Sequence, residues 1–489
     1  MKKIILIVCA LSFIANAQIK LELIKTLSGN STADQLTNIV ALGDINKDGY
    51  DDMALQYYVK SDSSYAKIYF GGKPFDTTKA IVFTNPKPKF YFKNVYGGGD
   101  INGDGVNDFV VIYDDHLAIH NPPQYEIQVH FGKSNINKDA DYSIKEIVGI
   151  IKLCAINGDF NGDGYDDIII SKPSYPNYGS FQIYYGGKEL KQNYDLQLYG
   201  TQDMTELGRW MVMPGDVNKD GFDDLIISEW KRLENSYESK AFLFFGGKEL
   251  SFNNGTVFTD NIPYGLYLNA LEDINGDGYK DFSITGGKRE VFLGGKQIDP
   301  LKPLFKSGKW MYDGIGDINK DGFSDFTRTF AKEIEVHLGN NTVDTIPDFT
   351  FKQDGAFYYL GDIDGNTTIE LGYKDYSPTT TMSIYAVLNG TSVNDEKQLP
   401  EKYSISQNYP NPFNPETIIN YTIPKSEHVM LKVYDLLGRE VATLVDEYKQ
   451  AGNYNCKLRI ENGGLTSGIY FYRLQSGDYS KAKKMVLAK

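Results

Sequence analysis

Short apolar runs of three to six residues alternate with polar, glycine-rich turns along most of this chain of 489 residues. Residues 39–42, 109–112 and 168–170 are such runs, and turn-forming residues flank them. Runs of this length between turns are typical of buried β-strands. The 36 Tyr and 27 Phe, set beside only 3 Trp and 9 Met, also favour strands over helices. The pattern therefore predicts an all-β chain.

One nonapeptide organises this alternation. Its first copy, residues 44–52, reads Asp-Ile-Asn-Lys-Asp-Gly-Tyr-Asp-Asp. Five further copies follow at residues 100–108, 159–167, 216–224, 273–281 and 317–325, and an altered seventh copy lies at 362–370. An apolar run precedes and follows each copy, and a third run ends in an aromatic-Gly-Gly signature such as Phe70-Gly71-Gly72. Each repeat therefore has three recognisable strands and room for a fourth.

Repeats of about 40–50 residues with four strands each are typical of β-propeller blades. Seven copies predict a seven-bladed β-propeller. The seventh repeat ends after its third strand, residues 382–388, whereas the strand-like segment 19–26 precedes the first repeat and has no other partner. An open ring would leave unpaired strand edges. We therefore predict that segment 19–26 is the outer strand of the seventh blade and closes the ring.

The nonapeptide has the chemistry of a calcium loop. Ca²⁺ takes about six to eight oxygen ligands. Positions one, three, five and nine offer side-chain oxygens, position seven offers a backbone carbonyl, and Gly at position six permits the sharp turn. The sequence thus predicts about six structural Ca²⁺ sites. Their ligands are Asp44, Asn46, Asp48, Tyr50 and Asp52; Asp100, Asn102, Asp104, Val106 and Asp108; Asp159, Asn161, Asp163, Tyr165 and Asp167; Asp216, Asn218, Asp220, Phe222 and Asp224; Asp273, Asn275, Asp277, Tyr279 and Asp281; and Asp317, Asn319, Asp321, Phe323 and Asp325.

Two other interpretations of these loops fit the sequence less well. An EF-hand needs a bidentate Glu at position twelve and flanking helices, but position twelve is Leu55, Val111, Ile170, Ile227, Ile284 or Arg328 and the flanks are strands. A metal-free turn has no need of three converging carboxylates. In the seventh copy Asn366 replaces the acid at position five and Thr367 replaces the Gly, so metal binding at 362–370 stays open.

The net charge indicates which kind of partner the protein is not suited to bind. It is −14, which argues against a nucleic-acid-binding protein because phosphates must be neutralised by basic residues. Six Ca²⁺ ions would offset most of this charge and relieve the repulsion between carboxylates in each loop. The ions are therefore expected to be structural, while a catalytic role for them is the minority interpretation.

The first residues resemble an export signal. Lys2 and Lys3 precede the apolar run 4–14, and the small-x-small sequence 15–17 follows. This predicts a signal peptide at 1–17, with a membrane anchor as the alternative. No later segment is apolar enough to span a membrane. Cleavage would leave Cys154 and Cys456, for which buried free thiols are favoured over a disulfide.

Residues 43–55 and 68–72 resemble the FG-GAP repeats of integrin α-subunits and their bacterial relatives. The resemblance covers about residues 18–390. It implies a seven-bladed propeller with calcium in the loop joining the first two strands of a blade, and adhesion through the opposite face. This chain departs from integrins in having six good loops and no inserted ligand-binding domain, so integrin ligand specificity cannot be carried over.

The C-terminal region is a second module. Residues 391–402 are polar and form a predicted linker, and strand-like segments at 429–434, 468–474 and 484–487 predict a small Ig-like β-sandwich over 403–489. The sequences at 409–415, 433–441, 465–472 and 483–486 resemble the type A sorting domain of the type IX secretion system. The resemblance implies export through the type IX machinery, by way of 403–489, to the medium or outer surface of a Gram-negative cell. An ordinary Ig-like binding domain is the alternative.

Three functions remain compatible with the sequence. The first is a non-enzymatic adhesin that binds an extracellular glycan or protein through loops 114–125, 172–180 and 229–239. The second is a propeller-type polysaccharide lyase or hydrolase, against which stands the low count of 5 His. The third is a structural surface component. The aromatic and His side chains in the three loops are His116, His120, Tyr125, Tyr175, Tyr178, Trp230 and Tyr237.

Overall fold

The computed structural model describes residues 20–488 with gaps. The gaps are 32–33, 60–63, 87–89, 116–123, 174–177, 201–204, 234–236, 248–254, 261–265, 287–288, 308–310, 331, 345, 377–380, 389–401, 409, 450–451, 461–464 and 478. Ile19–Asn389 forms one compact unit, the ring unit, and Gly390–Lys489 belongs to another, the tail unit. Every named element in the described residues is a strand, which confirms the predicted all-β chain.

The described strands of the ring unit form seven four-stranded antiparallel sheets. The sheets are β2 (Gln35–Gly43), β3 (Asp52–Tyr58), β4 (Tyr65–Tyr69) and β5 (Ile81–Phe83); β6 (Tyr91–Gly99), β7 (Asp108–Asp114), β8 (Gln124–His130) and β9 (Tyr142–Val148); β10 (Leu153–Ala155), β11 (Ile168–Lys172), β12 (Ser180–Tyr184) and β13 (Leu196–Tyr199); β14 (Thr205–Gly215), β15 (Asp224–Arg232), β16 (Tyr237–Phe244) and β17 (Thr256–Asp260); β18 (Tyr267–Glu272), β19 (Asp281–Thr285), β20 (Arg289–Phe292) and β21 (Phe305–Ser307); β22 (Met311–Gly316), β23 (Asp325–Phe330), β24 (Glu333–His337) and β25 (Phe349–Phe351); and β26 (Gly355–Gly361), β27 (Glu370–Asp375), β28 (Thr381–Leu388) and β1 (Lys20–Ser28).

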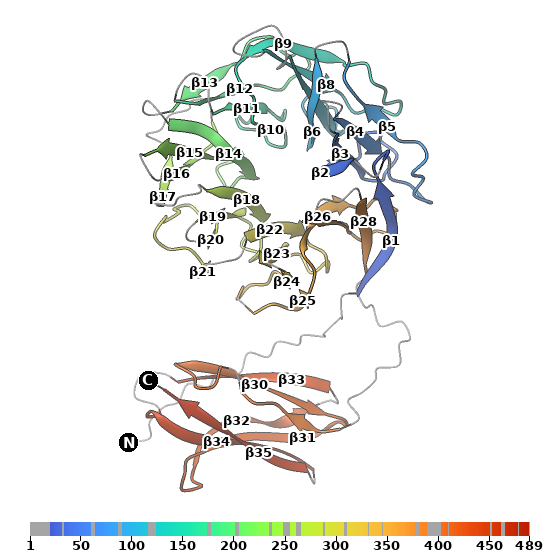
Figure 1. Ribbon diagram of the computed structural model, residues 1–489. Coiled ribbons are helices and arrows are strands. Elements are labelled where there is room, and N and C mark those ends of the chain that lie inside the picture. Colours follow the sequence, from blue (N-terminus) through green and yellow to red (C-terminus); the bar gives the residue numbers. More distant parts are fainter. Residues whose placement is uncertain are drawn as a thin grey trace. The chain divides into compact units, whose positions relative to one another are not determined.

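The sheets follow one another around a ring, with the first strand of each repeat nearest the centre (Figure 1). Each of these inner strands contacts the inner strand of the next sheet, from β2 through β6, β10, β14, β18 and β22 to β26. Strand β26 in turn contacts β2, so the circle of contacts is complete. Because no sheet edge at the centre is left without a neighbour, the ring protects its own strand edges.

The sheet that joins the two ends of the ring unit is built from distant segments. Strand β1 pairs antiparallel with β28, from Lys20 opposite Leu388 to Ser28 opposite Thr381. Leu27 and Met382 lie together in the core between this sheet and the first repeat. The N-terminal strand therefore occupies the outer edge of the last sheet.

Neighbouring sheets share one apolar core. Leu42 and Ile68 of the first repeat pack in the same cluster as Phe92 and Phe109 of the second. A single repeat could not bury this surface alone, so each sheet depends on its neighbours for stability.

The first Gly of the aromatic-Gly signature is required by packing. A Cβ on Gly186 would lie 2.4 Å from the carbonyl oxygen of Asp166, the eighth residue of an acidic nonapeptide. The equivalent distance is 2.2–2.5 Å for Gly71, Gly132, Gly246, Gly294 and Gly339. The signature therefore marks the place where the turn after the third strand meets the nonapeptide.

The tail unit consists of two sheets around its own core. One contains β29 (Ser404–Ile405), β30 (Glu416–Ile423) and β33 (Gly452–Arg459); the other contains β32 (Glu440–Lys449), β31 (Glu427–Tyr434), β34 (Gly468–Ser476) and β35 (Tyr479–Leu487). Ile419, Val433 and Tyr472 are among the buried residues that pack between them. Cys154 of the ring unit and Cys456 of the tail unit are both buried free thiols, as favoured by the sequence. The described residues include no helix long and apolar enough to span a membrane.

The packing around Gly186 generates a stability prediction. Gly186→Ala should destabilise the ring unit by about 1–3 kcal/mol because its methyl group meets backbone that cannot move freely. Gly468→Ala is the control, since its Cβ would meet nothing closer than 3.9 Å. Thermal or urea unfolding of both variants measures the effect, and an unchanged midpoint for Gly186→Ala would contradict this packing.

Candidate metal sites in the acidic loops

The seven nonapeptides, here called the acidic loops, connect the first and second strands of each sheet. The first loop shows their local construction. Asp44 accepts hydrogen bonds from the backbone N–H of Asp48 at 3.1 Å and of Gly49 at 2.8 Å. Asn46 accepts from the N–H of Asp48 at 2.9 Å, and Asp48 accepts from the N–H of Tyr50 at 3.1 Å. The backbone therefore curls around the side-chain oxygens at positions one, three and five.

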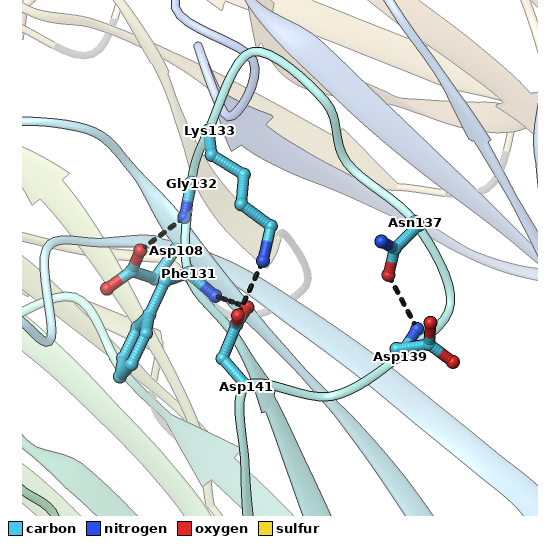
Figure 2. Close-up of polar contacts among 7 residues, drawn as sticks. All are labelled: Asp108, Phe131, Gly132, Lys133, Asn137, Asp139 and Asp141. Atoms are coloured by element: carbon cyan, nitrogen blue, oxygen red, sulfur yellow. Dashed lines mark hydrogen bonds and ion pairs between the residues drawn. The ribbon is translucent and has the colours of Figure 1, made fainter.

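The ninth residue is buried and joins the loop to the aromatic-Gly turn. Asp108 accepts the N–H of Gly132 at 2.7 Å with one oxygen (Figure 2). Its other oxygen accepts the N–H of Ile101 at 2.8 Å. The same two bonds, at 2.7–2.9 Å and 2.8–3.0 Å respectively, recur at Asp52, Asp167, Asp224, Asp281 and Asp325. All six carboxyl groups are fully buried. This contact explains why the two sequence signatures occur together.

Among the described residues, backbone hydrogen bonds connect five of the seven acidic loops directly to the loop before them. The N–H of Asp166 donates to the carbonyl of Asp100 at 3.0 Å, and the N–H of Gly187 donates to the carbonyl of Ile101 at 2.8 Å. The corresponding bonds from Asp51 to Asp362 at 3.0 Å and from Gly72 to Ile363 at 2.9 Å join the first repeat to the last. These bonds link most of the acidic loops into a belt on one face of the ring unit.

A second acidic residue stabilises some of the turns after the third strand. Asp141 accepts the N–H of Phe131 at 3.0 Å and pairs with Lys133, and Asp139 donates its N–H to Asn137 at 2.8 Å (Figure 2). Asp195 and Asp348 receive equivalent backbone bonds. Sequence reasoning missed these residues, although each lies ten positions after the aromatic or aliphatic residue that precedes the Gly of its signature.

The donor set of the loops fits a hard divalent cation. The side chains at positions one, three, five and nine each offer an oxygen ligand, as Ca²⁺ prefers. Asn161 in the third loop is 8% exposed, and its Oδ1 has no hydrogen-bond partner among the described residues. A buried carbonyl oxygen without a partner is costly unless something binds it. This oxygen is therefore available to a cation.

The loop carboxylates also lack close ion-pair partners among the described residues. In the described part of the chain, none of the acids at positions one, five and nine of the first six loops is ion-paired with Lys, Arg or His. Converging carboxylates without counter-charges repel one another. A bound cation would remove this repulsion.

The seventh loop brings three acids together most closely. Carboxylate oxygens of Asp362, Asp364 and Glu370 all lie within 4.8 Å of one another. This loop has an acid at position three where the others have Asn. Glu370 occupies the ninth position, is buried, and accepts the N–H of Ile363 at 2.8 Å. The seventh copy, for which the sequence left metal binding open, thus has the most compact acidic cluster among the described residues.

Burial changes the acidity of the ninth residues. Burial is the largest cause, neighbouring loop carboxylates add to it and backbone hydrogen bonds oppose it, and together they raise the pKa of Asp52, Asp108, Asp167 and Asp281 from 3.8 to about 7. For Asp224 and Asp325 the same causes raise the pKa to about 8. Without a cation, these buried groups favour the protonated form near neutral pH.

The face opposite the acidic loops carries the aromatic side chains considered as ligand contacts. The Arg209 guanidinium lies 4.6 Å from the centre of the Trp230 ring, and Tyr178 packs edge-on against Tyr199 at 6.1 Å. Tyr125 is only 3% exposed, so the expectation that its ring is a surface contact is wrong. His116, His120, Tyr175 and the side chain of Tyr237 lie outside the described residues.

Two histidines belong to the core. His130 stacks on Phe109 at 4.7 Å, and His337 stacks on Phe326 at 4.9 Å. Burial lowers the pKa of His130 to about 4 and that of His337 to about 3. Both are therefore neutral packing residues at physiological pH. Their side chains are buried, so neither is accessible to a substrate.

Family comparisons agree with both modules. Residues 159–227, which span the third and fourth acidic loops, match the family described as FG-GAP-like repeat. Residues 407–488 match the family described as secretion system C-terminal sorting domain. The chain carries FG-GAP-like repeats and a secretion sorting domain. The FG-GAP-like repeats lie in the ring unit and the sorting domain in the tail unit.

Curated relatives of the repeat region are integrin α-subunits. Integrin alpha-8 of Gallus gallus is 25% identical over 174 residues, which cover 31% of this chain and 16% of the relative. Integrin alpha pat-2 of Caenorhabditis elegans is 24% identical over 216 residues, which cover 39% of this chain and 17% of the relative. The match thus spans less than one fifth of the length of each relative. It supports the repeat type and says nothing about the rest of those proteins.

Similarity to solved structures is weak. A fungal alcohol oxidase in complex with copper covers 96% of this chain and 100% of its own, with 9% identity and a TM-score of 0.35. A similarity of this size supports neither a shared fold nor a shared activity.

The raised pKa values predict how the chelated protein responds to pH. The ninth residues keep protons in the folded state that they release when unfolded, because their pKa is raised from 3.8 to about 7 or 8. Stability in EDTA should therefore be highest at low pH and should decrease as the pH rises through about 4 to 8. Melting temperatures at about pH 5.5 and pH 8 test this. An equal or higher value at pH 8 in EDTA would contradict the prediction.

Proposed function

We propose that this protein is an exported, calcium-binding, seven-bladed β-propeller that acts as a binding or adhesion module. The proposed propeller spans residues 18–390 after removal of a signal peptide at 1–17. A linker at 391–402 connects it to the sorting domain at 403–489. The observation that carries the proposal is the repeated acidic loop, which offers oxygen donors and, at positions one, five and nine of the first six copies, has no ion-paired protein cation among the described residues.

The calcium assignment rests on residues that recur in register. Each of the six regular loops would hold an ion through the side chains at positions one, three, five and nine and the carbonyl at position seven. When bound, Ca²⁺ supplies the positive charge that the loops lack. In most of these loops each buried carboxyl oxygen of the ninth residue accepts one backbone N–H and keeps a second lone pair, whereas Oδ2 of Asp108 accepts from both Ile101 and Asn102. The same residue could therefore serve the ion and the turn together.

The sorting domain implies secretion through the type IX system, and surface attachment or release follows export. An extracellular location agrees with calcium as a structural ion. We infer that the ring unit meets its ligand, a glycan or a protein, outside the cell. A nucleic-acid partner is disfavoured by the net charge of −14.

The face opposite the acidic belt is the proposed ligand face. Strand β14 runs toward its acidic loop and β15 runs away from it, so Arg209 and Trp230 lie towards the far face. Tyr178 comes from the adjacent sheet, which an isolated bridge between Gly179 and Leu207 connects to β14. Aromatic faces beside charged groups suit contacts with sugars and proteins.

The enzyme alternative gains no support from the two described histidines of the core. His130 and His337 stack on phenylalanines in the core, and the regular loop acids are accounted for by the proposed metal sites. A structural surface component remains the second alternative. It differs from the binding module in a testable way, because it would have no soluble ligand.

Calcium should bind stoichiometrically and stabilise the ring. We expect about six ions per chain and a melting temperature that rises by more than about 10 °C in saturating Ca²⁺, because ligand binding to the folded state adds RT ln(1 + [L]/Kd) per site. Metal analysis after dialysis and thermal unfolding with and without EDTA measure both. A metal-free protein with an unchanged melting temperature would contradict the proposal.

Asp220→Asn separates the metal role from the hydrogen-bond role. Its amide oxygen can still accept the N–H of Phe222, which lies 3.1 Å from Asp220 in the parent. The variant should lose one ion per chain and melt earlier in Ca²⁺, whereas in EDTA it should lose only the bond that Oδ2 of Asp220 accepts from Nδ2 of Asn218 at 2.9 Å and should melt much closer to the parent. Asp139→Asn removes the same charge outside the acidic loops and should retain every ion. Equal ion counts in both variants would rule out the fourth loop as a site.

A ligand can be sought with glycan and matrix-protein arrays. We expect the full chain to bind at least one class of ligand in Ca²⁺, and Trp230→Ala with Tyr178→Ala to weaken that binding about tenfold or more without changing the ion count. Tyr194→Ala is the control, because Tyr194 is an exposed tyrosine in a turn on the face that carries the acidic loops. The absence of binding to any array would favour the structural alternative.

A further inference from the structure

The most exposed aliphatic residues of the tail unit lie together in one turn. Strands β31 and β32 are connected by residues 435–439, in which Leu436 is 67% exposed and Leu437 is 78% exposed. Turns of this kind are normally polar, and exposed apolar side chains that lie in a group usually mark an interaction site. Either the local structure of the turn or a binding partner must therefore account for the exposure of these two leucines.

The turn is built without the leucine side chains. Asp435 accepts the N–H of Leu437 and the N–H of Arg439 at 2.9 Å each, and its second oxygen pairs with Nε of Arg439 at 2.8 Å. The N–H of Asp435 donates to the carbonyl of Arg439 at 3.0 Å. Gly438 adopts a φ of 75°, which suits Gly. Polar residues at 436 and 437 would allow the same turn, so the leucines serve something other than local folding.

The apolar surface continues onto the neighbouring strands. Tyr434 stands directly opposite Phe471, and Ile469 lies two residues further along β34, level with the turn. Ile469 and Phe471 are each 38% exposed, whereas the alternate residues Tyr470 and Tyr472 are buried in the core. Ile469 and Phe471 therefore belong to the outward face of this sheet. With Leu436 and Leu437 they form one surface, here called the turn patch.

Positive charge borders the turn patch. The Arg473 guanidinium lies 4.8 Å from the centre of the Tyr434 ring and donates to its hydroxyl at 2.7 Å. Lys484 stands opposite Phe471 on β35. The nearby acids Asp435 and Glu440 are already paired with Arg439 and Lys432. The border is therefore positive overall, although the whole chain is acidic.

We propose that the turn patch is the surface by which the export machinery recognises this sorting domain. The partner would be a protein that offers an apolar pocket with an acidic rim. Because Asp435 holds the leucines in place before binding, little conformational entropy is lost on docking. The proposal deepens the assignment of 403–489 as an export signal, on which it rests, and is independent of any role of the ring unit.

Export of the full-length chain from a cell with a type IX system tests the proposal. Leu436→Ser with Leu437→Ser should lower the exported fraction at least tenfold and leave the protein in the periplasm, with the melting profile of the parent. Leu301→Ser is the matched control, since Leu301 is 82% exposed in the ring unit, and this variant should export normally. Normal export of the double variant would overturn the proposal.

Two further variants keep the test independent of the turn. Phe471→Ser should lower export as the leucine changes do, because it removes the centre of the same surface. Lys484→Glu should lower export by reversing a border charge, whereas Lys188→Glu in the ring unit should not. If both Phe471→Ser and Lys484→Glu are exported normally, the export machinery recognises other parts of the sorting domain, and the proposal is contradicted.

Two outcomes would assign the tail unit or the turn patch a different role. If a chain lacking 403–489 is exported as well as the parent, the tail is not the export signal, and the assignment and the proposal fail together. If the leucine variant exports normally but changes a dimer into a monomer in sedimentation, the turn patch joins two copies of this chain, and the proposal is overturned while the export assignment stands.

Discussion

The buried carboxyl group at the ninth position of each acidic loop is the contact on which the ring unit depends. It accepts one N–H from within its loop and, in six of the seven repeats, one from the aromatic-Gly turn that follows the third strand. This aromatic-Gly turn also donates a backbone N–H to a carbonyl of the preceding acidic loop. One side chain thus links the first, second and third strands of a sheet, and through the turn it links that sheet to its neighbour.

This arrangement places a charge where burial opposes it. The ninth residues are completely removed from solvent, and burial raises their pKa from 3.8 to about 7 or 8. Two backbone hydrogen bonds offset only part of that cost. A divalent cation at the loop would offset the remainder. In this interpretation the ion and the fold stabilise one another, which explains how an exported chain could hold a ring together without disulfides in its described residues.

The ring unit and the tail unit have separate proposed roles. The ring unit has its acidic loops on one face and Trp230 toward the other, so that the proposed metal sites and the proposed ligand contacts need not share residues. The tail unit has a separate core and a separate exposed surface around Leu436 and Leu437. Each surface can therefore be altered by mutation without disturbing the other, which makes the proposed roles separable by experiment.

Much of this protein could be predicted from its sequence, because repetition turns weak local signals into a strong one. Six copies of one nonapeptide in register were sufficient to predict an all-β chain, the strands on either side of each loop and the resemblance of the ring unit to FG-GAP repeats. The spacing also predicts which residues would bind calcium, and both these ligands and their occupancy stay predictions. The sequence could not show that Tyr125 is buried or that Asp364 gathers with Asp362 and Glu370. Those outcomes depend on which side chains face each other across neighbouring strands and loops. Only the tertiary structure decided two contacts between distant segments. Asp108 accepts a hydrogen bond from Gly132, 24 residues away, and the backbone N–H of Asp51 donates to the carbonyl of Asp362. Such segments meet only when the chain folds and the ring closes.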